Sequence, residues 1–363
     1  MAETPEQLAE LARLRQGIDG IDAELLRLIN ERAKLAHRIG EIKHGNIYRA
    51  EREAQVLRAV AERNPGPLSN EAAQRIIREV MSACLALEQP LTIAYLGPAG
   101  TYSEAAARKH FGAAPTAMPC AAIDDVFRAV ESGNAHYGVV PVENSTEGAI
   151  GRSLDLLLAT SLSICGEVVL PIHHNLMSRA ESLKDVTKVY SHAQSLGQCH
   201  EWLNRHLPDV PRLPVASNAE AARLASAEQG AAAVAGDAAA ELYGLNVLAA
   251  SIEDDPNNTT RWVVISDHDA SPSGVDKTSL VCSAQNRPGA VHDLLTPLAD
   301  NNVSMSRLES RPARGFGGSR WEYVFYIDID GHRQDAAVAA ALEELRLRAG
   351  FVKELGSYPK AVY

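Results

Sequence analysis

Two cationic side chains stand in the N-terminal segment where the pattern calls for apolar residues. Leucine and isoleucine recur there every three or four residues, and the apolar stripe from Leu28 to Leu35 passes through Arg32. Lys43 follows eleven residues later, close to three helical turns, so in a helix both cations would project from one face about 16 Å apart. A guanidinium on an apolar stripe is costly unless an anion meets it. Such a pair could bracket a small dicarboxylate.

Arg15 raises the question of a partner subunit. It precedes Arg32 in the same segment by about 25 Å of helix, which is too far for both to hold one small ligand within one chain. If Arg15 does share that ligand, it must come from a second copy. Alternatively, these cations are surface residues whose stems cover apolar surface, or that form ion pairs along the helix. Spacing alone leaves both interpretations open.

The segment that carries these cations is predicted to be helical. Its apolar positions step by three and four from Leu11 to Ile42, which is the stripe of one long helix packed along its length. Shorter helices are expected over about residues 49–63 and 70–87, and Pro90 should end the last of them.

The run LARLRQGIDGIDAELLRLINERAKLAHRIGEIK, followed by YRAEREAQVL, resembles the all-helical chorismate mutase family. The resemblance implies an intertwined dimer that supplies one arginine across its interface to bind chorismate. Arg15 would be that arginine, and Arg32 and Lys43 match the other cationic positions. Arg52 and Glu53 match the pair on the second helix, where Glu53 would take the substrate hydroxyl.

The family implies a Claisen rearrangement of chorismate to prephenate, which needs no covalent catalyst. Catalysis then consists of holding a chair-like conformer and stabilising charge on the breaking ether oxygen. Lys43 would be one donor to that oxygen. Glu88 matches the second donor position, often glutamine in the family, and we expect it to act as the protonated acid. Cys84 matches a nearby position often filled by serine, and Arg49 stands where some members have an aspartate.

From residue 91 the pattern changes to short β-rich runs, among them TRWVVIS at 260–266, that alternate with alanine-rich helical ones, which predicts an α/β fold. Asn144 to Thr146 should follow a strand and lead into a helix whose first amides favour an anion, although a plain capping box would give the same pattern. Singly, each motif of this segment is weak. The four motifs are GPAGTYS at 97–103, ENSTEG at 143–148, SHAQSLGQC at 191–199 and NTTRW at 258–262.

In order and spacing these motifs resemble the prephenate dehydratase family, over residues 91–266. The resemblance implies two α/β lobes with the site in the cleft between them, where prephenate would lose carbon dioxide and hydroxide to give phenylpyruvate. Thr260, or a group donating through it, would be the general acid, and Arg261 would pair with a carboxylate. Trp262 replaces the usual phenylalanine, which we interpret as a packing change. The residues expected to line the pocket are Glu143, Asn144, Ser145, Ser191 and Gln198.

The sequence does not indicate a metal or a cofactor. His, Cys and carboxylate residues nowhere cluster at ligand spacing, and the glycines at 97–100 do not form the dinucleotide-binding pattern. His173 and His174 lie on a predicted strand and point to opposite faces, so we interpret them as structural.

The C-terminal segment is predicted to be a small α+β module. A linker rich in Ser, Pro, Gly and Asp covers 267–276, and strands and helices follow in the order βαββα of a ferredoxin-like fold. NRPGAVHDL and RLESRP resemble the signature segments of the ACT regulatory domain of prephenate dehydratases, where L-phenylalanine binds between paired domains. A fused sensor implies allosteric inhibition. His292 departs from the commoner apolar residue. The residues implied for the effector site are Gly289, Ala290, Val291, Glu309, Ser310, Arg311 and Pro312.

Composition limits the remaining classes of protein. A net charge of −11 argues against nucleic-acid and membrane-surface partners, because these need a basic face. The apolar runs fall far short of the roughly 18 residues of a membrane span, and five scattered cysteines suggest no disulfide framework. We therefore expect a cytoplasmic protein, and the resemblance to the chorismate mutase family implies a homodimer or higher homo-oligomer.

The expected division is an all-α chorismate mutase domain (1–90), a two-lobed α/β prephenate dehydratase domain (91–267) and a ferredoxin-like ACT domain (277–363). Two alternatives stay open. The middle domain could have lost its chemistry and only sense a ligand, leaving a regulated mutase, although the Thr260–Arg261 pair speaks against this. The dehydratase could instead prefer the aminated substrate arogenate.

Overall fold

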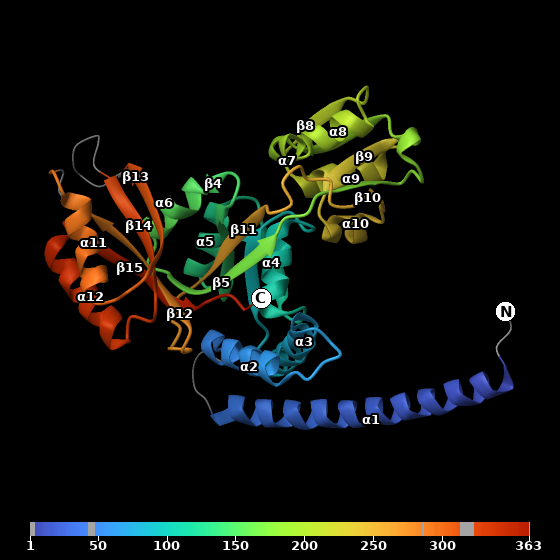
Figure 1. The fold of residues 1–363 in the computed structure, drawn as a ribbon, viewed down its shortest axis with the longest axis horizontal. Coiled ribbons are helices and arrows are strands. Elements are labelled where there is room, and N and C mark those ends of the chain that lie inside the picture. Colours follow the sequence, from blue (N-terminus) through green and yellow to red (C-terminus); the bar gives the residue numbers. More distant parts are fainter. Residues whose placement is uncertain (1–3, 43–47, 285–286, 313–322, 363) are drawn as a thin grey trace.

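Three helices form the N-terminal part of the chain, as predicted. The computed structural model describes residues 4–42, 48–284, 287–312 and 323–362. Figure 1 shows α1 as a long rod beside the shorter α2 and α3. No residue of α1 is buried, and its apolar residues Leu14, Ile18 and Ile21 are each more than half exposed. The three helices are α1 (Pro5–Ile42), α2 (Ala50–Arg63) and α3 (Asn70–Glu88).

Helices α2 and α3 pack on each other and dock on the α/β part of the chain. Ser69 caps α3 by accepting from the backbone N–H of Ala72, which satisfies one of the free amides of the first turn. On the docking side, Arg58 of α2 donates to the carbonyl of Ser273, 2.9 Å away, in the segment that precedes β12. The mutase-like helices are thus tied to a segment more than 200 residues away in the sequence.

The first sheet of the α/β part has the order β2-β1-β3-β11-β5, with β4 paired to β3. Strand β1 is parallel to β2 and β3, whereas β11 runs antiparallel to β3 and β5. Strand β11 therefore returns from the second sheet to the centre of the first. The strands are β1 (Thr92–Leu96), β2 (Thr116–Cys120), β3 (Tyr137–Asn144), β4 (Gly148–Ala149), β5 (Ser163–Pro171) and β11 (Thr259–Ser266), and the helices are α4 (Tyr102–Phe111), α5 (Ile123–Glu131) and α6 (Gly151–Ala159).

The second sheet, of order β10-β6-β9-β7-β8, forms a separate lobe. The chain enters it after β5 and leaves it before β11, so two connecting segments join the lobes (Figure 1). The predicted two-lobed α/β fold is confirmed. Its elements are β6 (Asn175–Ser178), the 3-10 helix η1 (Leu183–Asp185), β7 (Lys188–His192), α7 (Ala193–Gln198), α8 (His200–His206), β8 (Arg212–Val215), α9 (Asn218–Ala227), β9 (Ala231–Ala235), α10 (Asp237–Tyr243) and β10 (Asn246–Ala249).

The third sheet, of order β13-β14-β12-β15, belongs to the C-terminal module. The ferredoxin-like prediction is confirmed, but the predicted order βαββα lacks the last strand, β15, which pairs with β12 along its length. Its polar, glycine-containing sequence shows no apolar run, and its burial arises from neighbours distant in the chain. The elements are β12 (Asp276–Ser283), α11 (Ala290–Asp300), β13 (Met305–Pro312), β14 (Tyr323–Asp330), α12 (Ala336–Arg348) and β15 (Phe351–Pro359).

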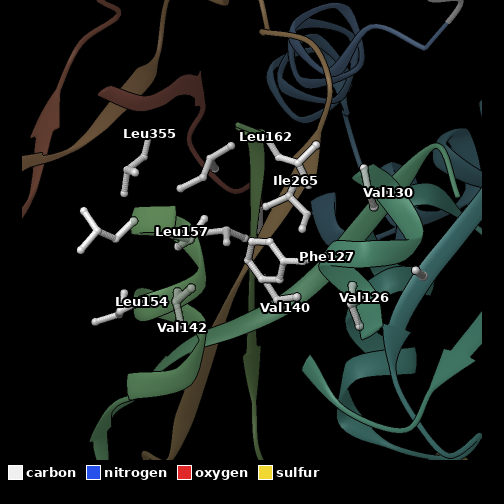
Figure 2. Close-up of a cluster of buried hydrophobic side chains, with 14 of the residues drawn as sticks. Val126, Phe127, Val130, Val140, Val142, Leu154, Leu157, Leu162, Ile265 and Leu355 are labelled. Carbon is white, nitrogen blue, oxygen red and sulfur yellow. The ribbon is translucent and has the colours of Figure 1, made fainter. Parts of the chain in front are cut away.

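The C-terminal sheet packs directly on the first sheet of the α/β part. Leu355 of β15 joins a buried cluster with Phe127, Leu157 and Ile265 of the first lobe (Figure 2). Gly356, with φ +146°, approaches β5 so closely that a Cβ there would lie 2.1 Å from the carbonyl oxygen of Ile164. A side chain at that position would force the two sheets apart.

Two absences hold for the part of the chain just described. None of its helices is both long and apolar enough to cross a membrane. None of its His, Cys, Asp and Glu side chains gather in threes in a way that could hold a metal ion.

Candidate active sites

Two of the cations expected to bind chorismate lie on the same helix. Arg15 and Arg32 are both on α1, which is continuous between them, so they are about 25 Å apart along its axis. Arg15 is exposed and Arg32 is partly buried. Lys43 lies outside the described residues. The distance between Arg15 and Arg32 is therefore too long for both side chains of one chain to hold the same small ligand.

Glu88 lies against α1 near the C-terminal end of that helix. A Cβ on Gly40 would be 2.7 Å from Glu88 Oε2, so the carboxyl group packs on α1 at that glycine. Gly40 precedes Lys43 by three residues in the sequence. Cys84, one turn before Glu88 on α3, is buried. Glu88 thus packs on the last turn of α1, at Gly40.

Glu53 has surroundings that differ from the sequence-based expectation. Its Oε1 lies 3.6 Å from Arg78 Nε, and it lines a pocket of about 40 Å³ together with His110 and Glu167 of the α/β part. Burial raises the pKa of Glu53 to about 7. Its carboxyl group therefore lies between the mutase-like helices and the α/β domain, and is not presented to a ligand of α1. Arg52 is exposed.

A buried polar cluster joins the two lobes around Asn144, the last residue of β3. Asn144 Nδ2 donates to Thr260 Oγ1 at 2.8 Å and to Asn258 Oδ1 at 2.7 Å. Its Oδ1 accepts from the backbone N–H groups of Thr146 and Glu147 at 3.1 and 3.0 Å. Asn144, Thr260 and Asn258 are each no more than 8% exposed. The amide of Asn144 therefore fixes the hydroxyl group of Thr260.

The turn after Asn144 corrects one local prediction. Asn144 to Thr146 were expected to lead into a helix, but β4 intervenes and α6 begins only at Gly151. Asn144 Oδ1 satisfies the amides of a turn, which is the capping role that competes with an anion site. Ser145 is exposed, and its Oγ accepts from the backbone N–H of Thr259 at 2.9 Å.

Gln198 and His174 extend this cluster into the second lobe. Gln198 Oε1 accepts from Asn258 Nδ2 at 3.2 Å and lies 2.8 Å from His174 Nε2. On the other side of the ring, His174 Nδ1 lies 3.2 Å from the hydroxyl of Tyr102, which belongs to the 97–103 motif. Burial lowers the pKa of His174. Three of the four motifs, 97–103, 143–148 and 258–262, thereby meet the fourth through Gln198.

The contacts of His174 with Gln198 and Tyr102 were not predicted from the sequence. Residues 172–174 lie between β5 and β6 and not on a strand, and His174 is 1% exposed within the polar cluster. Nothing in the spacing of a His-His pair signals this contact, because its partners lie 24 and 72 residues away. Ser191 is also buried, and its Oγ bonds to the carbonyl of Val234 at 2.7 Å. In this arrangement Ser191 supports the second sheet.

Arg261 and Glu143 point away from Thr260, which corrects two predicted pocket residues. Alternate side chains of a strand face opposite sides, so the neighbours of Thr260 and Asn144 face the C-terminal sheet. Arg261 donates to Glu167 Oε2 at 2.8 Å, Asp328 Oδ2 at 2.6 Å and the Tyr358 hydroxyl at 2.8 Å. Burial alone lowers the pKa of Arg261, but Tyr358 and the two carboxylates raise it overall. The guanidinium of Arg261 is thus hydrogen-bonded to three acceptors where the α/β part meets the C-terminal sheet.

Trp262 and the 97–103 motif form the packing under this cluster. Trp262 Nε1 donates to Ser103 Oγ at 3.0 Å, and both residues are buried. Thr101 caps α4 by accepting from the backbone N–H of Glu104. The tryptophan in place of the usual phenylalanine therefore fills the core and gains a hydrogen bond, in agreement with a packing change.

The residues expected to bind an effector lie at the start of α11 and on β13. Gly289 has φ +80° and precedes α11, whose first residues are Ala290 and Val291. On β13, Ser310 and Pro312 are exposed. Arg311 lies 3.4 Å from Asp155 of α6, so it contacts the dehydratase-like lobe and not the effector face. Glu309, on the same side of β13 as Arg311, is partly buried and also faces away from Ser310.

Comparisons with known proteins agree with this three-part structure. The family model for chorismate mutase type II matches residues 14–89, that for prephenate dehydratase residues 93–270, and that for the ACT domain residues 278–347. A bifunctional chorismate mutase/prephenate dehydratase from Neisseria gonorrhoeae is 56% identical over 100% of both chains. A second, from Pseudomonas aeruginosa, is 49% identical over 97% of this chain and 98% of its own.

A solved structure resembles the α/β and C-terminal parts. Prephenate dehydratase from Arthrobacter aurescens in complex with L-Phe is 35% identical, with a TM-score of 0.67, over 74% of this chain and 90% of that chain. Three family models in sequence order and relatives of full length leave one assignment. The chain belongs to the family of bifunctional chorismate mutase/prephenate dehydratases.

Proposed function

We propose that this chain converts chorismate to prephenate on its N-terminal helices and prephenate to phenylpyruvate in its α/β domain, and that L-phenylalanine inhibits it through the ACT domain. The observation that carries the second activity is the hydrogen bond from Asn144 to Thr260, inside a buried network that joins both lobes. We retain the division at 1–90, 91–267 and 277–363, a cytoplasmic location and action without a metal or cofactor as parts of this proposal.

The mutase site is proposed to need two copies of the chain. Arg15 of one copy and Arg32 of the other would hold the two carboxylates of chorismate, while Lys43 and the protonated Glu88 donate to the ether oxygen as its bond breaks. The apolar residues of α1 that lie exposed in one chain fit burial against a second copy, because a stripe of this length is otherwise unusual on a monomer. This supports a homodimer.

The dehydratase step must move one proton and break two bonds to the ring. The C–C bond to the ring carboxylate breaks and carbon dioxide leaves; the electron pair of that bond enters the ring, one existing double bond shifts toward the carbon that bears the hydroxyl, and the ring then has three double bonds. The ring hydroxyl leaves with a proton, as water. Because Thr260 Oγ1 accepts from Asn144, its own proton stays available to the leaving oxygen. Thr260 would be re-protonated from solvent or by a neighbouring group.

The role proposed for Glu88 predicts a pH dependence of the mutase. If Glu88 donates as the neutral acid, mutase activity falls as the pH rises and the carboxyl group ionises beside a developing negative charge. Glu88→Gln cannot ionise, so its activity should be flat over the same pH range. The measurement is the initial rate of chorismate consumption against pH for both proteins. Equal slopes in the two profiles would refute this role.

His174 is expected to position Gln198 for the dehydratase. A glutamine side chain can place its amide near the position of Nε2, and an asparagine near that of Nδ1, so the two variants keep different contacts. We expect His174→Asn, which loses the Gln198 contact, to lower dehydratase kcat/KM about tenfold more than His174→Gln, the worth of one buried hydrogen bond. Mutase activity of the same samples reports folding. Equal losses in the two variants would show that only packing matters.

The direct test of the proposed function uses the full chain. Purified protein given chorismate should form phenylpyruvate with prephenate as an intermediate, and added L-phenylalanine should slow the second step. Chorismate consumption that stops at prephenate would favour the alternative of a regulated mutase with a ligand-sensing middle domain. A higher kcat/KM with arogenate than with prephenate would favour an arogenate dehydratase.

A further inference from the structure

Strand β13 presents two different faces to its surroundings. Arg307 and Arg311 are partly buried on the side toward the dehydratase domain, whereas Leu308 and Ser310 alternate with them on the other side. Arg307 Nε lies 3.0 Å from Glu143 Oε2, and Arg311 Nη2 lies 3.4 Å from Asp155 Oδ1. One strand therefore carries proposed effector-site residues on one face and cations that hold the catalytic domain on the other.

Glu143 links this contact to the dehydratase site. It precedes Asn144 on β3, and it lies opposite Arg261 on β11, while Asn144 lies opposite Thr260. Glu143 Oε2 is 3.8 Å from Arg261 Nη1, so the carboxylate sits between two guanidinium groups. Glu143 and Asn144 are consecutive residues of β3, so a shift of the backbone at Glu143 would reach the residue whose amide fixes the Thr260 hydroxyl.

Among the described residues, Glu143 is the carboxylate within salt-bridge distance of Arg307, and the charge of Arg307 also acts on the buried carboxylate of Asp328. The side chain of Arg307 is 11% exposed, and its Nε and Nη2 atoms are buried without a well-aligned hydrogen bond to any described residue. By contrast, Arg261 donates to three acceptors. A buried guanidinium whose Nε and Nη2 lack well-aligned hydrogen bonds is the more easily shifted of the two, because fewer directional contacts define its position.

We propose that Arg307 is a positioning residue that the ACT domain contributes to the dehydratase site. Its ion pair with Glu143 sets the position of Asn144 and thereby of Thr260. An effector bound at the Ser310 face of β13 changes the reaction rate by shifting Arg307 on the opposite face. This inference rests on the proposed function, namely on Thr260 as the dehydratase donor and on L-phenylalanine as the ACT ligand.

The test uses the full-length protein and the variants Arg307→Met, Glu143→Gln and their combination. Each single change should lower dehydratase kcat about five- to thirtyfold with little change in KM, the range expected for coupling through packed side chains. The double variant should be no worse than the poorer single one, because both changes remove the same ion pair. L-phenylalanine should still bind, as followed by calorimetry, but its effect on kcat should be lost.

Arg346→Met is the matched control. Arg346 is also an ACT-domain arginine paired with a carboxylate, Glu354, but it lies half exposed within that domain. This variant should keep wild-type kcat and wild-type inhibition. Mutase activity reports folding in every sample, and Arg307→Lys, which keeps the charge, should recover part of kcat. If Arg307→Met does not fold, Glu143→Gln tests the same pair from the other side.

Two results would overturn the proposal while leaving the proposed function intact. One is wild-type kcat and full inhibition by L-phenylalanine in Arg307→Met or Glu143→Gln. The other is a double variant whose loss equals the product of the single losses, which would show independent sites. Failure of the proposed function looks different, because the unmodified protein would then form no phenylpyruvate.

Discussion

Thr260→Ala should abolish phenylpyruvate formation from prephenate and leave the conversion of chorismate to prephenate unchanged. Loss of a positioned proton donor costs about 10²- to 10⁴-fold in rate. The hydroxyl group of Thr260 accepts from Asn144 Nδ2 through a lone pair and so keeps its own proton to give. Both rates can be followed in one sample, because the two reactions use separate parts of the chain.

Two further variants separate the hydroxyl group from packing. Thr260→Val keeps the shape of the side chain and removes the hydroxyl, so it should be as inactive as Thr260→Ala, whereas Thr260→Ser should keep measurable activity. Thr259→Ala is the matched control, since the adjacent threonine faces the other way and its Oγ1 makes only a 3.3 Å bond to the carbonyl of Asn257. An active Thr260→Val would rule out Thr260 as the donor.

The placement of Thr260 and Arg261 shows how much of the site the sequence could predict. The run TRWVVIS was predicted as a strand, and neighbouring residues of a strand face opposite sides. The strand prediction therefore already implied that Thr260 and Arg261 could not share one pocket. A shared motif suggested otherwise, because a motif records which residues occur together and does not say which way each one points. On β3, Glu143 and Asn144 likewise belong to one motif but face opposite sides of the strand.

Other features could not be predicted from a single sequence. The partners of His174 lie on α4 and α7, and those of Glu167 come from β11, β12 and the segment after β15. Local periodicity carries no information about contacts between such distant segments. The long helix of the mutase domain was predicted because its stripe is local, whereas β15 was missed because its burial depends on β12 and β5.

The largest effect expected on the mutase is complementation: two variants that are each inactive should regain mutase activity when they are mixed. Arg15→Ala and Arg32→Ala should each lower mutase activity at least about 10²-fold, since each removes a fixed charge from the substrate. Their mixture should recover about a quarter of wild-type activity, because half of randomly paired dimers are mixed and each has one intact site. Dehydratase activity, which uses neither residue, measures the amount of folded protein.

A dimer with both substitutions on the same chain provides the control. It distinguishes a site built from two chains from a site built within one chain. A dimer of one wild-type chain and one chain carrying both substitutions has no intact site if Arg15 and Arg32 act across the interface, and one intact site if they act within a chain. Along the continuous helix α1 the two side chains are about 25 Å apart, which favours the first outcome. Tagging the two chains differently allows each mixed dimer to be purified and assayed. Activity in the dimer with one wild-type chain, and none in the dimer of two single variants, would place the whole mutase site within one copy.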